Sequence, residues 1–101
     1  MENMKNIKHQ DKYVVVRTYS AGVHVGKLES RSSKEVVLSD ARRIWSWTGA
    51  LSLHEIAQGE FGNNSRISCA VSEIELTEAI EIITCSPEGE NNLRSYPAWR
   101  V

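Results

Sequence analysis

Short runs of β-branched and alternating apolar residues cover most of the chain, and this pattern predicts strands rather than long helices. The first run spans residues 12–19 and has three valines, residues 14–16, at its centre. Such side chains fit a pleated sheet better than a helix. A second run over residues 23–29 follows a short loop that contains Gly22. The two runs are therefore predicted to form a β-hairpin.

Successive residues of a strand point to opposite faces of a sheet. One face of the first predicted strand mixes aromatic, apolar and cationic side chains, namely Tyr13, Val15, Arg17 and Tyr19. Because this mixture is amphipathic, we expect the face to be solvated or to bind a ligand.

Two further strands are predicted over residues 34–38 and 41–48, after a polar turn at residues 30–33. Ser39 and Asp40 separate these strands, and we expect a second turn there because both side chains can bond nearby backbone amides. The Ile, Trp and Thr content of residues 41–48 favours a strand, with a helix as the alternative.

Residues 52–57 carry the clearest helix signal. Ser52 and Glu55 have the spacing of a capping box, in which the hydroxyl and the carboxylate each bond a backbone amide near the helix start. Leu51 and Ile56 flank the box at the spacing of a hydrophobic staple. We therefore predict a helix of roughly two turns that ends at a following glycine.

The Ile-rich stretch over residues 67–85 is predicted to form two strands, split by a bulge or turn near residues 77–79. A helix over residues 73–83 is the alternative. Residues 86–88, Ser-Pro-Glu, have the cap, the first-turn proline and the acidic residue of a helix start. That helix is expected to be short and weakened by Gly89.

Length and charge limit the classes of protein that the chain can belong to. Its 101 residues and 11.4 kDa are enough for one domain. Twelve Lys and Arg residues against 13 Asp and Glu residues give a formal net charge of −1, which argues against binding of long nucleic acids by bulk electrostatics. We expect a soluble intracellular protein, because the sequence shows neither an apolar run of roughly 20 residues nor a signal peptide.

Together these patterns predict a flexible tail over residues 1–11 and a single domain over residues 12–101. The predicted fold class is α+β, a small antiparallel β-sheet with one short α-helix packed on or beside it. Cys69 and Cys85 are sixteen positions apart and match no metal-site spacing. We predict two reduced, mostly buried thiols, with a disulfide as the alternative, and no metal or cofactor.

Catalysis has little support in the sequence. Asp11 and Asp40, the two aspartates, fall in the predicted tail and in a predicted turn. His24 lies within a predicted strand and His54 in the first turn of the predicted helix. Since no motif places a base beside a nucleophile, we predict that the protein is not an enzyme.

A binding site is better supported, by two clusters. Residues 42–47 read Arg-Arg-Ile-Trp-Ser-Trp, and arginine matches phosphate oxygens while tryptophan offers a face for a base. Alternatively, the two tryptophans fill the core. Residues 17–24 form the second cluster, where amides of the Gly22 turn are predicted to form an anion-binding nest. The predicted ligand-binding residues are Arg17, Tyr19, His24, Arg42, Arg43, Trp45 and Trp47. Because Arg and aromatic residues are also enriched at subunit interfaces, we expect a homo-oligomer.

Six short motifs follow one another along the chain, at residues 13–23, 28–31, 35–38, 41–47, 49–52 and 76–82. In this order they resemble a family of short proteins that tailed phages and prophages encode, described only as a domain of unknown function. The resemblance covers residues 13–85. It implies an accessory protein of the counter-defence type, by analogy with small phage proteins that lack catalytic motifs.

The leading hypothesis is a non-enzymatic phage protein, acting in the host cytoplasm, that binds and sequesters a nucleotide-type immune signal. A cyclic ADP-ribose isomer or a cyclic oligonucleotide would be such a ligand. One alternative is a protein–protein inhibitor or adaptor that acts on a host enzyme. A single-stranded nucleic-acid binder is the other, although the balanced charge argues against it.

Overall fold

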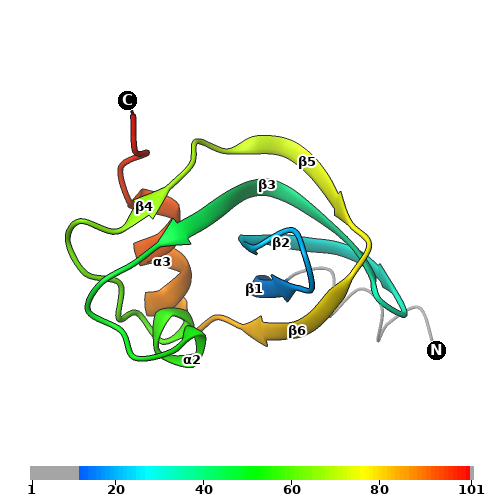
Figure 1. The fold of residues 1–101 in the computed structure, drawn as a ribbon, viewed down its shortest axis with the longest axis horizontal. Coiled ribbons are helices and arrows are strands. Elements are labelled where there is room, and N and C mark those ends of the chain that lie inside the picture. The colour runs from blue at the N-terminus through cyan, green and yellow to red at the C-terminus, as the bar shows by residue number, and fades with distance from the viewer. Residues whose placement is uncertain (1–11, 101) are drawn as a thin grey trace.

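The computed structural model describes residues 12–100, which form a sheet of six strands and two short helices (Figure 1). The strands are β1 (Tyr13–Thr18), β2 (Val23–Ser32), β3 (Glu35–Ser46), β4 (Arg66–Ile67), β5 (Val71–Leu76) and β6 (Ala79–Thr84), and the helices are α2 (Leu53–Ala57) and α3 (Pro87–Ser95). All strand pairs are antiparallel, so the predicted α+β class is confirmed. No helix in this part of the chain is long and apolar enough to cross a membrane. The predicted tail, residues 1–11, lies outside the described residues.

The strands lie in the order β4-β3-β2-β1-β6, and β5 pairs with β3 beside β4. On the edge of β3 away from β2, Ile44 pairs with Ile67 of β4 while Leu38 pairs with Ile74 of β5. Residues 77–78 alone join β5 to β6, although β6 lies at the far end of the order beside β1. The sheet is therefore strongly curved, and β5 and β6 meet at one end of the molecule (Figure 1).

Both faces of the curved sheet are buried against apolar groups. Val14 and Val16 of β1 pack with Leu38 of β3 and Leu76 of β5 in one core. The opposite face of β1 packs against α2 and α3 in a second core. A strand buried on both faces needs apolar residues at consecutive positions, which accounts for the run of valines in β1.

The predicted solvated or ligand-binding face of β1 is wrong for its first half. Tyr13 and Val15 are 3% and 0% exposed, because the two helices cover them. Arg17 is exposed, as is Tyr19 directly after the strand. The residues that share this face of β1 were predicted correctly, but sequence alone did not show that a helical layer covers the face.

The predicted turn at Ser39 and Asp40 is also wrong, because β3 continues through both residues. Asp40 and Ala41 together lie opposite the single residue Gly26 of β2, which makes a β-bulge. Asp40 adopts a φ of 51°, in the left-handed region that aspartate tolerates. A Cβ at Gly26 would lie 2.9 Å from the Ser39 carbonyl oxygen, so the close approach of the backbones requires glycine there.

The later strands agree with the sequence except at residues 68–70, which lie between β4 and β5 and form no strand. β5 and β6 confirm the strand prediction over the helical alternative for residues 73–83. The break between them falls at residues 77–78, as predicted. The polar turn predicted over residues 30–33 is narrower than expected, because β2 continues to Ser32.

α2 forms where it was predicted, but its capping differs. Ser52 is the N-cap residue, yet its side chain makes no capping hydrogen bond. The Glu55 carboxylate instead accepts a hydrogen bond from the backbone amide of Leu51. Since Leu51 is 90% exposed, it forms no hydrophobic staple with the buried Ile56. The helix has only five residues and depends on its buried face.

α3 begins as the sequence predicts. The Ser86 hydroxyl accepts a hydrogen bond of 3.0 Å from the Gly89 amide, and Pro87 occupies the first turn. The helix spans nine residues, and Gly89 is buried rather than a point of weakness at the surface. α3 is the longer of the two helices that cover β1.

Candidate ligand-binding site

The structure separates the seven residues predicted to bind a ligand. Arg17 lies on β1 and forms an ion pair with Glu81 of β6, with 3.0 Å between Nε and Oε1. Tyr19 follows the strand and is 80% exposed. Both residues lie toward β6, at the opposite end of the strand order from β4.

The turn at Gly22 is closed by hydrogen bonds within the hairpin, which engage the Ala21 amide that the predicted anion-binding nest would use. The Ala21 amide donates to Thr18 Oγ1 at 2.8 Å. The Ala21 carbonyl oxygen lies 2.9 Å from both His24 Nε2 and Arg43 Nη2. Burial, and then the nearby Arg43 charge, lower the pKa of His24, which keeps the ring neutral. His24 and Arg43 thus hold the hairpin turn together.

Arg42 is a structural residue rather than a phosphate ligand. Its side chain is buried between β3 and α3. Nε donates to the Ser68 carbonyl at 2.7 Å, and Nη1 donates to the Leu93 carbonyl at 2.8 Å. Leu93 lies in the last turn of α3, where helix carbonyls lack helical partners. The guanidinium of Arg42 is therefore engaged in capping α3.

Trp45 and Trp47 have different environments. Trp47 is partly buried against the core and donates its Nε1 proton to the Ala50 carbonyl at 3.3 Å. This agrees with the alternative in which tryptophan fills the core. Trp45 is 50% exposed. Its ring stacks on that of Trp99, with centroids 6.3 Å apart and an angle of 17° between the planes.

Trp99 and Arg66 are the residues that sequence reasoning missed. The guanidinium carbon of Arg66 lies 4.5 Å from the centroid of the Trp99 ring, which is a cation–π contact. Arg66 belongs to β4, and the Trp99 amide donates to the Ile67 carbonyl at 2.9 Å. The two residues lie in a two-residue strand and a terminal segment, where no hydrophobic period marks them.

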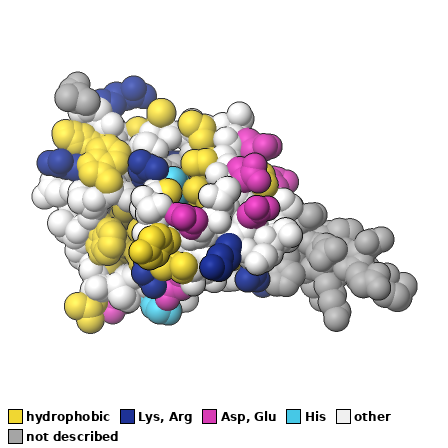
Figure 2. All heavy atoms as spheres, turned by 45° about the vertical axis from the view of Figure 1, so that its right-hand side comes forward, with side chains coloured by type: hydrophobic (Ala, Val, Ile, Leu, Met, Phe, Trp, Pro, Cys, Tyr) yellow, Lys and Arg dark blue, Asp and Glu magenta, His cyan; other side chains and the backbone are white. Residues whose placement is uncertain are grey.

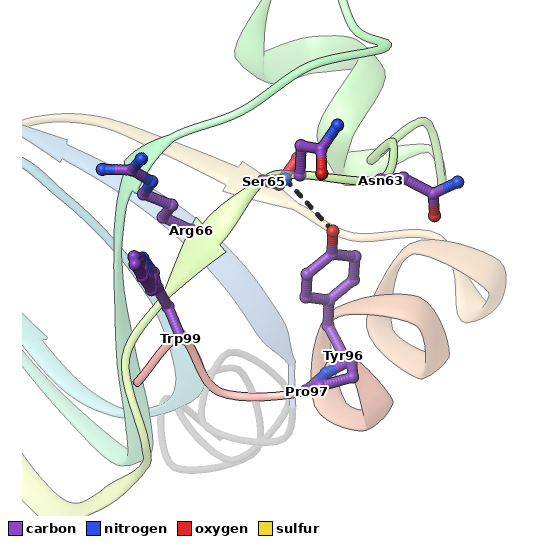
Figure 3. A pocket seen from close by; sticks show the side chains of 7 residues that line it. Asn63, Ser65, Arg66, Tyr96, Pro97 and Trp99 are labelled. Carbon is purple, nitrogen blue, oxygen red and sulfur yellow. Dashed lines mark hydrogen bonds between the residues drawn. The ribbon is translucent and has the colours of Figure 1, made fainter. Parts of the chain in front are cut away.

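A pocket of about 580 Å³ lies beside this cluster (Figure 3). Residues before and within β4 and residues after α3 line it: Asn63, Asn64, Ser65, Arg66, Tyr96, Pro97 and Trp99. Figure 3 shows Arg66 and Trp99 together on one side and Tyr96 opposite them, below Ser65. The volume lies within the range of small-molecule sites.

Tyr96 fixes one wall of the pocket. Its hydroxyl accepts a hydrogen bond from the Ser65 amide at 3.1 Å and donates one to the Gly62 carbonyl at 2.7 Å. The Tyr96 ring also packs edge-to-face on Phe61, with centroids 4.7 Å apart. Because ring and hydroxyl are both held, little ordering is left for a ligand to impose on this wall.

Arg66 supplies the positive charge of the pocket. Within residues 12–100 no hydrogen bond or ion pair engages its guanidinium, which rests on Trp99, so its N–H groups are free to bind an anion. The seven lining residues include no carboxylate, imidazole or thiol, and the Ser65 hydroxyl donates to the Gly62 carbonyl at 2.8 Å. The guanidinium suits binding of an anion, while the Trp99 ring is already in contact with Arg66 and Trp45.

Charge and apolar surface are unevenly distributed. On the face in Figure 2, Lys and Arg side chains lie among large hydrophobic side chains at one end, and acidic side chains gather on the other side. Exposed Glu73 and Glu75 on β5 contribute acidic charge away from Arg66. A formal net charge of −1 thus conceals a local basic and aromatic area.

The two cysteines are free thiols in different surroundings. Cys69 is exposed, so the prediction that both are mostly buried is wrong for this residue. Cys85 is partly buried, and burial raises the pKa of its thiol to about 12. Cys69 lies between β4 and β5, in residues 68–70, which belong to no strand.

The fold and the pocket define a small antiparallel-sheet protein with an arginine–tryptophan pocket. Residues 11–93 match the model of a family described as a domain of unknown function (DUF6948), and the chain belongs to this family. Comparison with curated proteins and with solved structures found no match. The family match covers all six strands but ends before Tyr96 and Trp99, which line the pocket.

Proposed function

We propose that the protein binds a nucleotide-type ligand in the pocket beside Trp99 and withholds it from other proteins. The observation that carries this proposal is Arg66, which rests on Trp99 at the pocket with its N–H groups free. A guanidinium binds phosphate through charge-assisted hydrogen bonds, and an aromatic ring stacks on a base. The side-chain amides of Asn63 and Asn64 add hydrogen-bond donors and acceptors for the edge of a base or for the sugar.

Binding without catalysis is favoured because the pocket lining holds no carboxylate, imidazole or thiol, and the hydroxyls of Ser65 and Tyr96 both donate to the Gly62 carbonyl. A sequestering protein acts by stoichiometry, so the dissociation constant must be near or below the ligand concentration, about micromolar or tighter. We infer a counter-defence role in the host cytoplasm from the resemblance to short phage proteins. A cyclic ADP-ribose isomer or a cyclic oligonucleotide is the expected ligand.

Ligand recovery tests the proposal directly. The purified chain is incubated with a panel of cyclic nucleotides and cyclic ADP-ribose isomers, separated from free ligand and then denatured. Intact ligand that is released only on denaturation supports sequestration. Chemically altered ligand would show an enzyme instead, and no retained ligand at micromolar protein would overturn the proposal.

Matched arginine variants locate the site. Arg66→Ala is expected to weaken ligand binding at least tenfold, measured by calorimetry, because the anion loses its charged partner. Arg17→Ala removes an exposed arginine on β1, away from the pocket, and is expected to leave affinity within twofold. Equal losses in the two variants would show that general positive charge, rather than this pocket, attracts the ligand.

A single nucleic-acid strand is the second candidate, because half-exposed Trp45 extends the aromatic surface beyond Trp99. Short single-stranded oligonucleotides therefore belong in the panel. Binding of a strand would weaken steeply with salt, whereas a ligand enclosed in the pocket would respond less. A steep salt dependence with no cyclic ligand retained would favour the strand.

A further inference from the structure

The edges of the sheet are protected to different degrees. The outer edge of β4 is covered, since the Trp99 amide donates to the Ile67 carbonyl. β5 carries exposed Glu73 and Glu75, and charged side chains hinder edge-to-edge pairing. β6 pairs with β1 on one side, and no strand within residues 12–100 pairs with its other side.

β6 lacks the usual protection of an edge strand. Its six residues, Ala-Ile-Glu-Ile-Ile-Thr, contain neither proline nor glycine. Glu81 is the one charged residue, and its carboxylate is bound by Arg17 of the neighbouring strand. Ile80 is 48% exposed. A largely apolar strand whose outer edge pairs with no strand of residues 12–100 is a template for another strand.

The hydrogen-bond pattern shows which backbone groups are free. The Cys85 amide donates to the Tyr13 carbonyl at 2.9 Å, so alternate residues before Cys85 face β1. Antiparallel strands alternate in this way, and the register pairs Ile83 with Val15. The N–H and C=O groups of Ile82 and Thr84 consequently point to the open edge.

We propose that β6 pairs with β6 of a second copy of this chain, antiparallel and across a two-fold axis at Ile82. In this register Ile82 lies opposite Ile82 of the second copy, and Ile80 lies opposite Thr84. The β-branched side chains then form a ladder on one face, which covers the exposed part of Ile80. One contact satisfies both open edges, whereas a peptide would satisfy only one.

The two ends of β6 differ in the charged residues beside them. The Ala79 amide donates to the Lys34 carbonyl, and Arg31 lines a small cavity beside the start of the strand. Glu78 directly precedes Ala79, and its carboxylate accepts a hydrogen bond from the Ser20 hydroxyl. Past the other end, Glu88 lies in the first turn of α3 next to Gly59. Antiparallel pairing brings Arg31 and Lys34 of one copy toward Glu88 of the other.

Mass measurement at several concentrations tests the interface. Sedimentation equilibrium of the full chain from about 1 to 100 μM is expected to give a species of twice the 11.4 kDa chain mass. Ile80→Lys places a charge in the ladder, and Thr84→Pro removes an amide that points outward. Each is expected to weaken dimerisation at least tenfold.

Val71→Lys is the matched control, since Val71 is 49% exposed on β5 and lies outside the proposed contact. It is expected to remain dimeric, and circular dichroism confirms that each variant is folded. A folded variant that loses the dimer only when β6 is changed supports the interface. A monomeric wild-type chain over the whole range, or dimers that persist in both β6 variants, would overturn it.

Discussion

Gly89 of α3 lies so close to Ala57 of α2 that a Cβ on Gly89 would come within 1.9 Å of the Ala57 carbonyl oxygen. That carbonyl is also held by the Ser86 amide, at 2.9 Å. The end of α2 is therefore bonded directly to the start of α3. In the sequence Gly89 resembles a helix-weakening residue, but in the fold it makes the contact between the two helices possible.

Gly89→Ala is expected to lower the free energy of unfolding by about 2–3 kcal/mol, because overpacking outweighs the gain in helix propensity of about 1 kcal/mol. Urea denaturation measures the change. Asn91→Ala, at an exposed position of α3, is the control and should stay within about 0.5 kcal/mol. A Gly89→Ala variant as stable as the wild type would contradict the close contact between α2 and α3.

Arg42→Lys is expected to cost about 2–4 kcal/mol of stability. Lysine cannot reach both the Ser68 and the Leu93 carbonyls with the fork that arginine provides, so a buried acceptor loses its partner. Arg43→Lys changes the adjacent exposed arginine, which makes one bond to Ala21, and is expected to cost less than about 1 kcal/mol. Similar losses in both variants would argue against a capping role for Arg42.

The lowered pKa of His24 predicts that the stability of the protein depends on pH. Burial, followed by the charge of Arg43, lowers its pKa below the ordinary value of 6.5. Below pH 6.5 the unfolded chain therefore binds more protons than the folded chain, and stability falls as the pH falls through this value. Above it the contribution of His24 is complete.

The free energy of unfolding at about pH 7.5 and about pH 5.5, compared between wild type and His24→Gln, isolates this effect from that of the carboxylates. Glutamine keeps an amide donor for the Ala21 carbonyl. We expect the drop on acidification to be smaller in the variant, by up to about 1 kcal/mol. Identical drops in the two proteins would show that His24 takes up a proton as readily in the folded chain as in the unfolded chain.

The two thiols are expected to react at different rates. Cys69 is exposed, while burial raises the pKa of Cys85 to about 12. A thiol reagent near neutral pH should modify Cys69 quickly and Cys85 only when the protein unfolds. In Cys69→Ser the fast phase should disappear. A fast phase that survives this substitution would show that Cys85 is accessible in the folded state.

Much of the site was hidden from the sequence because its residues meet only through long-range contacts. Arg66 and Trp99 lie far apart in the sequence and come together where the C-terminal segment bonds to β4. Of the predicted residues, Trp45 alone joins this cluster. Arg42 has the chemistry of a phosphate ligand, but α3 takes up its hydrogen bonds.

The sequence by itself determined where most of the strands lie and where α3 begins, because β-branched runs and the Ser86-Pro87 cap act over a few neighbouring residues. Tertiary structure decided which faces are covered, which arginine is buried and which tryptophans stack. It also turned Asp40 from a predicted turn residue into a bulge opposite Gly26. Local preferences are the same for every fold that contains a given segment, whereas burial and hydrogen-bond partners depend on which distant segments lie beside it.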